Sequence, residues 1–327
     1  MNARIPVILC IDVEPDPQRP TTPAPWRGFE ELYLFLQKLR PRMQDTTGKP
    51  AKLNWSWRAD PQIEMVYGSA EWALRHYHVE IAETAQEGDD HGMHPHAWRW
   101  DVECKRWIHD YGNPIWLEHC ITTSFKVYES VFGTVCQTVR LGGRYFDDRV
   151  RETLERLGCL YDLTIEPGEK SAPGFLQDYQ HMKMGPYRPS VQDFKKPAGS
   201  RSDGLWMIPM SAGVMSEQGL KWRRGLRKYV SASGPIPTGY GTLRLWEPPE
   251  LVQPAIEETL QNLEQPYLAF AIRSDVLQNP WWGKNCQRNL EGLLKQRHAT
   301  QFVFCTPQDL LRMFGLPVHQ MVPGVVD

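Results

Sequence analysis

The sequence predicts a parallel α/β fold that closes into a barrel. Apolar runs of strand length alternate with segments of helical periodicity, which is the pattern of a parallel sheet covered by helices. About seven segments have strand character, and this number favours a barrel over a small open sheet. No internal repeat or long simple linker interrupts the chain, so we expect one domain over residues 1–327, with irregular insertions around residues 166–204 and 211–250.

The predicted strands are apolar runs bounded by polar residues or turns. Residues 5–12 form a continuous apolar run followed by acidic residues and proline, as in a buried parallel strand whose carboxyl end opens into a site. Further strands are expected at residues 51–58, 90–96, 160–165, 205–210, 267–272 and 301–305, with a strand end at residues 139–143.

Helices are predicted between these strands. The clearest covers residues 147–158, where apolar side chains recur at helical spacing, Asp147 can cap the first turn and Gly158 can cap the last. Others are expected at residues 62–85, 116–132, 254–263 and 285–297, and after Thr306, which can cap a last helix that has Pro307 in its first turn.

Composition and charge exclude several classes of function. The 37 basic and 39 acidic residues leave a net charge of -2 and are spread along the chain, which argues against nucleic-acid binding. No stretch approaches the roughly 20 apolar residues that a transmembrane helix needs, and the first apolar run is too short for a secretory signal. The seven cysteines are scattered and form no C-x-x-C pair, which fits reduced packing thiols. We therefore expect a cytoplasmic location.

Two acidic residues end the first predicted strand. Asp12 and Glu14 are two positions apart, so on an extended chain their side chains share a face. One carboxylate could bind a metal while the other accepts a proton. The alternative for this pair alone is a solvated strand end or a helix cap.

Histidines follow the predicted strand at residues 90–96. His94 and His96 share one face of an extended segment, and His91 falls on the other. Neutral imidazoles together with a carboxylate are a usual ligand set for catalytic zinc. The pattern indicates a metal site, of the kind that binds zinc, built from His94 and His96 with a carboxylate from the Asp12 and Glu14 pair.

Two basic features have a functional and a plain interpretation. Arg140 stands at a strand end before two glycines, where it could orient a carboxylate or stabilise negative charge, or could be a surface residue beside a turn. Residues 221–228 contain five basic residues in eight, which could form a solvated face or could meet a phosphate of a nucleotide-linked or lipid-linked sugar.

The order of these motifs resembles that of the NodB-homology polysaccharide deacetylases (carbohydrate esterase family 4 and relatives). The resemblance covers about residues 5–315 and rests on three stretches: Ile-Asp-Val-Glu14, Gly-Asp-Asp-His-Gly-Met-His-Pro-His-Ala-Trp98, and Arg140-Leu-Gly-Gly-Arg-Tyr145 followed by a helix and Leu-Gly-Cys-Leu-Tyr-Asp162. It implies a distorted (β/α)7-type barrel and metal-dependent removal of an N-acetyl or similar acyl group from an amino sugar of a surface polysaccharide or its precursor.

The resemblance also implies roles for individual residues. Asp12 would be the catalytic base, and Arg140 would orient it. Glu14, His94 and His96 would hold a divalent metal, which we expect to be Zn²⁺. The residues that we expect to contact a carbohydrate or sugar-conjugate substrate are Asp60, Trp98 and Tyr145.

The sequence departs from the family pattern at two points. The family's second histidine usually comes four residues after the first, but Trp98 occupies that position, so His96 or a residue from elsewhere must serve. The family's last motif carries a histidine as general acid, and here Arg273 takes its place. Arginine cannot donate a proton at neutral pH, which leaves three alternatives. Another group protonates the leaving amine, or Arg273 acts only electrostatically, or the chain no longer catalyses the reaction.

Two rival functions follow from these departures. The same fold and metal could serve an amidase acting on a small non-sugar amide, because neither selects the substrate. A catalytically inactive homologue that binds metal or carbohydrate is the rival that Arg273 motivates.

Overall fold

A parallel sheet forms the centre of the molecule. The computed structural model describes residues 4–170, 178–199, 203–216 and 239–318. The strands run in the order β11-β1-β2-β3-β6-β7-β8, and β12 pairs with the start of β1. Their bounds are Ile5–Val13 (β1), Asn54–Trp57 (β2), Asp90–Met93 (β3), Thr138–Val139 (β6), Tyr161–Asp162 (β7), Trp206–Met207 (β8), Leu268–Arg273 (β11) and Phe302–Phe304 (β12).

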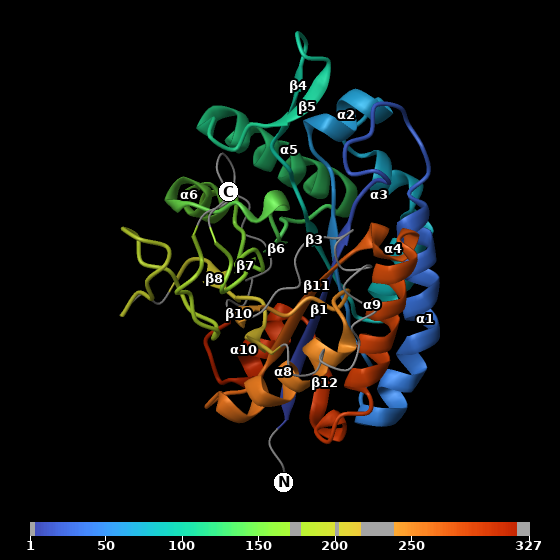
Figure 1. Cartoon of the computed structure of the whole chain (residues 1–327). Helices are drawn as coiled ribbons and strands as arrows, with labels where there is room; N and C mark the ends of the chain where they lie inside the picture. The colour runs from blue at the N-terminus through green and yellow to red at the C-terminus, as the bar shows by residue number, and fades with distance from the viewer. Residues whose placement is uncertain (1–3, 171–177, 200–202, 217–238, 319–327) are drawn as a thin grey trace.

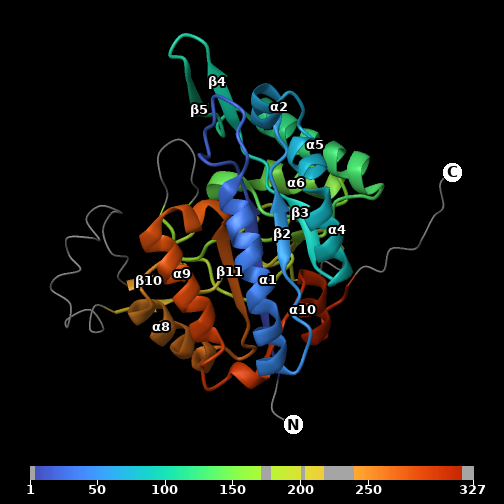
Figure 2. The same ribbon diagram turned by 90° about the vertical axis from the view of Figure 1, so that its right-hand side faces the viewer.

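Helices surround this sheet on its outer side (Figures 1 and 2). Helices α1 and α9 lie side by side in both views and cover the face formed by β1 and β11. The helices are α1 (Arg27–Thr47), α2 (Pro61–Tyr67), α3 (Trp72–His76), α4 (His78–Gln86), α5 (Pro114–Phe132), α6 (Asp148–Arg156), α8 (Pro249–Asn262), α9 (Pro280–Leu293) and α10 (Pro307–Met313), with short 3-10 turns η1 (Gly142–Arg144), η3 (Ser274–Gln278) and η4 (Ala299–Gln301).

The sheet curls into a barrel whose two edges meet through contacts of Ser211. The strand pairing described for the chain ends at β8 on one side and at β11 on the other. Ser211 bridges the gap: its backbone N–H donates to the carbonyl of Ala269 at 2.8 Å, and its hydroxyl accepts from the N–H of Ala269, also at 2.8 Å. The predicted distorted α/β barrel is therefore confirmed, with a seam in place of a continuous ladder.

Strand β1 separates two cores and points its last residues into the barrel. Its alternate residues Val7, Leu9 and Ile11 belong to the large core between sheet and helices, whereas Ile8 and Cys10 belong to the smaller core inside the barrel. Because side chains alternate along a strand, Asp12 continues the inward-facing row. The sequence of β1 thus brings a carboxylate to the carboxyl end of the barrel interior, where sites of parallel barrels lie.

The predicted elements are present, though most strands are shorter than expected. The segment predicted as one helical stretch, residues 62–85, is divided into α2, α3 and α4. The sequence analysis did not assign α1, nor the two hairpins β4 (Trp98–Asp101) with β5 (Arg106–His109) and β9 (Ala212–Met215) with β10 (Gly239–Thr242). Among the described residues, no helix combines the length and the apolarity that a bilayer crossing requires.

Candidate metal centre and active site

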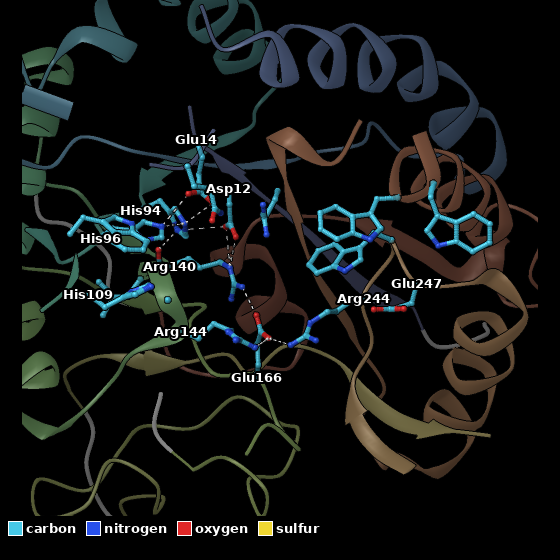
Figure 3. Close-up of a pocket in the computed structure, with 18 of the residues that line it drawn as sticks. Asp12, Glu14, His94, His96, His109, Arg140, Arg144, Glu166, Arg244 and Glu247 are labelled. Atoms are coloured by element: carbon cyan, nitrogen blue, oxygen red, sulfur yellow. Dashed lines mark hydrogen bonds and ion pairs between the residues drawn. The ribbon is translucent and has the colours of Figure 1, made fainter. Parts of the chain in front are cut away.

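A cavity of about 390 Å³ opens at the carboxyl ends of the strands (Figure 3). Asp12 and Glu14 line one end of it, together with the two histidines of the β3–β4 loop, and Figure 3 shows Arg244 and Glu247 on the opposite side. This volume lies within the range of about 300–1,000 Å³ that is common for small-molecule sites.

Glu14, His94 and His96 converge at one end of this cavity. One ligand atom from each lies within 4.8 Å of the others, and all three side chains are buried. The Nε2 atoms of the two histidines are 3.2 Å apart. Glu14 places Oε2 3.2 Å from His96 Nε2 and Oε1 3.6 Å from His94 Nε2. We call these three residues the cradle.

The chemistry of the cradle fits a divalent cation. His94 Nδ1 lies 2.6 Å from the carbonyl oxygen of Arg140, which can only accept, so Nδ1 carries the proton and Nε2 presents its lone pair to the cradle. Glu14 Oε2 is buried and has no hydrogen-bond partner among the described residues. The lone pairs of the imidazole nitrogens and of the carboxylate face one another in a buried site, and a bound cation would remove their repulsion. A set of one carboxylate and two imidazoles suits zinc.

Electrostatics favour the metal-binding protonation states of Glu14 and His96 and place His94 in a negative field. Burial, and then the charge of Arg58, lower the pKa of His96 to about 3, so this ring is neutral at pH 7. Burial opposes ionisation of Glu14, but His96 and His94 outweigh it and hold the pKa of this carboxyl well below its usual range. Burial would also lower the pKa of His94, yet Asp12 and Glu14 outweigh it and raise that pKa. A divalent cation would relieve this same negative field.

Asp12 stands next to the cradle and is held by Arg140. Arg140 Nε donates to both carboxylate oxygens of Asp12, at 3.0 and 3.1 Å. The other end of the guanidinium is fixed by the carbonyl of Leu163 at 2.7 Å and by Glu166 Oε1 at 2.6 Å. Asp12 Oδ1 lies 3.7 Å from His94 Nδ1. This geometry presents an oriented carboxylate beside the cradle, as the sequence analysis expects of a base.

Comparison with solved structures identifies the fold. A candidate glycoside hydrolase/deacetylase from Parabacteroides distasonis superposes with a TM-score of 0.56 at 12% identity, over 95% of this chain and 71% of that one. The chain has a NodB-type deacetylase fold. A candidate polysaccharide deacetylase from Mycobacterium smegmatis is also similar, with a TM-score of 0.49 and 11% identity over 100% of this chain and 96% of that one. No family model and no curated protein matches the sequence.

Within this deacetylase fold, a buried carboxylate ties three arginines together. Glu166 is contacted by Arg140, by Arg144 at 3.2 Å and by Arg244 at 3.0 Å. Burial would raise the pKa of Glu166, but the three guanidinium groups outweigh burial and hold it far below its usual range. Glu166 thereby fixes the arginine that orients Asp12, and the sequence analysis did not identify it.

We expect Glu166→Gln to destabilise the protein at neutral pH. Removing one partner of a buried ion pair costs about 3–5 kcal/mol. Because the folded-state pKa of Glu166 is depressed, the stabilisation is present above the pKa of the unfolded chain and is lost as the pH falls through the folded-state pKa. Urea denaturation from pH 7 to pH 3 should therefore show a stability difference that narrows in acid. A difference that stays constant with pH would mean that Glu166 acts through packing.

Arg273 and Trp98 line the cavity as the sequence analysis expects. Arg273 pairs in register with Asp12 across β11 and β1, and its guanidinium binds Asp275 at 3.0 and 2.5 Å. Trp98 stacks on His96 with ring centroids 6.2 Å apart and packs against His109 at 3.7 Å. Trp98 therefore supports a cradle residue as well as the cavity wall.

Two residues expected to contact substrate lie elsewhere. Asp60 is fully buried and is absent from the described lining of the cavity, because its oxygens bind the first turn of α2, Arg58 and the backbone of His96. Tyr145 lines a smaller neighbouring cavity, donates its hydroxyl proton to Asp147 and stacks on Tyr111. This geometry does not support substrate contact by either residue. The basic segment at residues 221–228 lies outside the described residues.

Several lining residues carried no recognisable signal in the sequence. They come from segments between the predicted motifs, where isolated polar and aromatic residues have ordinary explanations. They are Gln18, which donates to Glu14 Oε1 at 2.8 Å, together with His109, Arg244, Trp246, Glu247, Trp281 and Trp282.

Proposed function

We propose that the protein is a metal-dependent hydrolase that removes an N-acetyl or similar acyl group from an amino sugar of a surface polysaccharide or its precursor. One observation carries the proposal: the Glu14, His94 and His96 cradle lies beside an Asp12 whose two oxygens both accept from Arg140 Nε. The position of this arrangement at the carboxyl end of the barrel supports the proposal, as does the word deacetylase in the name of the similar Parabacteroides protein.

The residues divide the chemistry between them. A divalent cation in the cradle would polarise the acyl carbonyl and make the attacking water more acidic. Asp12 accepts the proton of this water on a carboxylate oxygen, and the same proton then passes to the nitrogen of the leaving amine as the C–N bond breaks. Arg140 keeps Asp12 aimed at the cradle through its hydrogen bonds to both carboxylate oxygens. Arg273 places a fixed positive charge at the end of the neighbouring strand, where it stabilises negative charge that develops on the carbonyl oxygen.

The walls of the cavity suit a saccharide. Four tryptophans, from three parts of the chain, line it beside charged groups: Trp98, Trp246, Trp281 and Trp282. Tryptophan offers a flat apolar face against which a sugar ring can stack, while polar neighbours bind its hydroxyl groups. A small acyl amide would leave most of these residues without contact, which favours the amino sugar over the small amide.

The test is acetate release from N-acetylhexosamine oligosaccharides and conjugates by the zinc-loaded protein. We expect turnover that stops when a chelator removes the metal and returns when zinc is restored. Turnover of small non-sugar amides alone would establish the amidase instead. Metal binding without turnover of any amide would identify a binding protein and contradict the proposal.

Arg273→Ala should lower kcat/KM about 100-fold while metal content is unchanged. The expected size is that of losing one group that stabilises an oxyanion, and the side chain is outside the cradle. Arg288→Ala on the outer face of α9, where Arg288 pairs with Glu250 at 3.1 Å, is the matched control and should retain activity. Unchanged kinetics in Arg273→Ala would remove this residue from the active site.

A further inference from the structure

His96 lies in a loop after strand β3, outside any helix or strand. Strand β3 ends at Met93, so both histidines follow the strand. The N–H of His94 still binds the carbonyl of Trp57 at 2.7 Å, as in a continuing ladder. Pro95 has no N–H to donate. The backbone of His96 donates instead to a side chain, Asp60 Oδ2, at 3.0 Å.

We propose that Arg58 and Asp60 are positioning residues that hold Glu14 and His96 in a metal-binding arrangement. The inference rests on the metal centre of the proposed function and extends it to residues that do not touch the metal or the substrate. It also gives Asp60 a role that differs from the substrate contact expected from the sequence.

The carboxylate of Asp60 accepts hydrogen bonds on both oxygens, which fix its position. Oδ1 accepts the backbone N–H groups of Gln62 at 3.0 Å and Ile63 at 3.2 Å, which caps α2. Oδ2 accepts from Arg58 Nε at 2.8 Å and from the N–H of His96. The side chain is fully buried, and the start of a helix therefore anchors the second histidine.

Arg58 extends this anchorage to the carboxylate of the cradle. Its side chain is fully buried, with Nη1 3.5 Å from Glu14 Oε2 and 3.1 Å from the carbonyl of Gln18, while Nη2 contacts Gln62 Oε1. Gln18 in turn donates to Glu14 Oε1 at 2.8 Å. One planar guanidinium thus binds both Gln18, the partner of Glu14, and Asp60, the partner of His96. A lysine, with a single ammonium group, could not bind both.

The ring of His96 is confined as well as its backbone. A Cβ on Gly142 would lie 2.0 Å from His96 Cδ2, so the ring packs directly on this glycine. On other sides it stacks on Trp98, and Tyr111 Oη lies 3.3 Å from its Nδ1. With the ring confined in this way, the placement of its Nε2 depends on the backbone, which is held by Asp60 and by the N–H of Gly142, a donor to the carbonyl of Pro95 at 2.9 Å.

The decisive variant is Asp60→Asn. The amide keeps the shape of the side chain but replaces one oxygen by a donor. Whichever way the amide is turned, its NH₂ group meets N–H donors and not acceptors. In one orientation these donors are Arg58 and the backbone of His96, and in the other they are the N–H groups at the start of α2. Loss of such a partner of a metal ligand typically lowers metal affinity about 10- to 100-fold. We expect a loss of this size for zinc in competition with a chromophoric chelator, and an altered visible absorption spectrum of the cobalt-substituted protein.

The matched control is Asp89→Asn. Asp89 binds Arg40 in a buried pair at 2.9 and 2.7 Å and accepts from the N–H of Leu53, but it precedes β3 at the opposite end of the barrel. This variant should lose thermal stability and keep the parent's zinc affinity and cobalt spectrum. Arg58→Lys retains the charge without the planar fork, should also weaken zinc binding, and replaces Asp60→Asn in the test if that variant does not fold.

The outcomes separate this inference from the proposed function. Weakened zinc binding and a changed cobalt spectrum in Asp60→Asn or Arg58→Lys, with both retained in Asp89→Asn, support the positioning role. Parent-like affinity and spectrum in folded Asp60→Asn would overturn the positioning role and leave the metal centre standing. A parent protein that binds no zinc would overturn both.

Discussion

Asp12→Asn is expected to lower kcat by about 100- to 10,000-fold and to leave the zinc content near that of the parent. A general base contributes about this much to catalysis, and an amide cannot accept the proton. Asp12 lies beside the cradle and is not one of its three ligands, so zinc should remain bound. Single-turnover deacetylation together with metal analysis measures both effects.

Glu14→Gln is the comparison for this prediction. Glu14 is two residues away on the same face, but it belongs to the cradle, so its amide variant should lose zinc affinity first and activity in consequence. If Asp12→Asn lost the metal while Glu14→Gln retained it, the roles of base and ligand would have to be exchanged.

His94→Ala is expected to remove bound zinc and, with it, all measurable turnover. The substitution deletes one of two imidazoles in a site with three protein ligands, and the remaining pair should not retain zinc through dialysis. His109→Ala is the matched control, because His109 lines the same cavity outside the cradle. It should keep about one zinc per chain. Full zinc occupancy in His94→Ala would show that the metal binds elsewhere.

The sequence was sufficient for the barrel and for the residues that end its first strands. Apolar runs and polar strand ends depend on local pattern, and parallel topology then brings those ends together. Asp12 and Glu14 at the end of β1 and Arg140 after β6 are placed together for this reason. The barrel seam at Ser211 depends on a contact with Ala269, which no local pattern predicts.

Helix α1 has a helical pattern of apolar residues in its sequence, although no helix was predicted there. Its buried residues Phe29, Leu32, Leu36, Leu39 and Met43 recur at helical spacing, but Pro41 lies within the helix. Proline removes a backbone donor and usually marks a helix end. Here the tertiary contacts of the apolar face override that local signal.

The supporting residues of the site could not be inferred from sequence because they act through distant partners. Glu166 follows a predicted strand, but its importance comes from arginines 22, 26 and 78 positions away. Asp60 was expected to contact substrate, yet it binds the backbone of His96, which is 36 positions away. Spacing along the chain gives the residue types of a site, and the fold decides which of them meet the substrate.

The central claim is that Glu14, His94 and His96 together hold the catalytic metal. Anomalous diffraction at the zinc absorption edge, from crystals grown with zinc, tests it most directly. We predict one strong peak within bonding distance, about 2.0–2.2 Å, of a Glu14 carboxylate oxygen and of Nε2 in both His94 and His96. A peak bound by a different set of side chains, or no peak at this cradle in zinc-saturated crystals, would contradict the account.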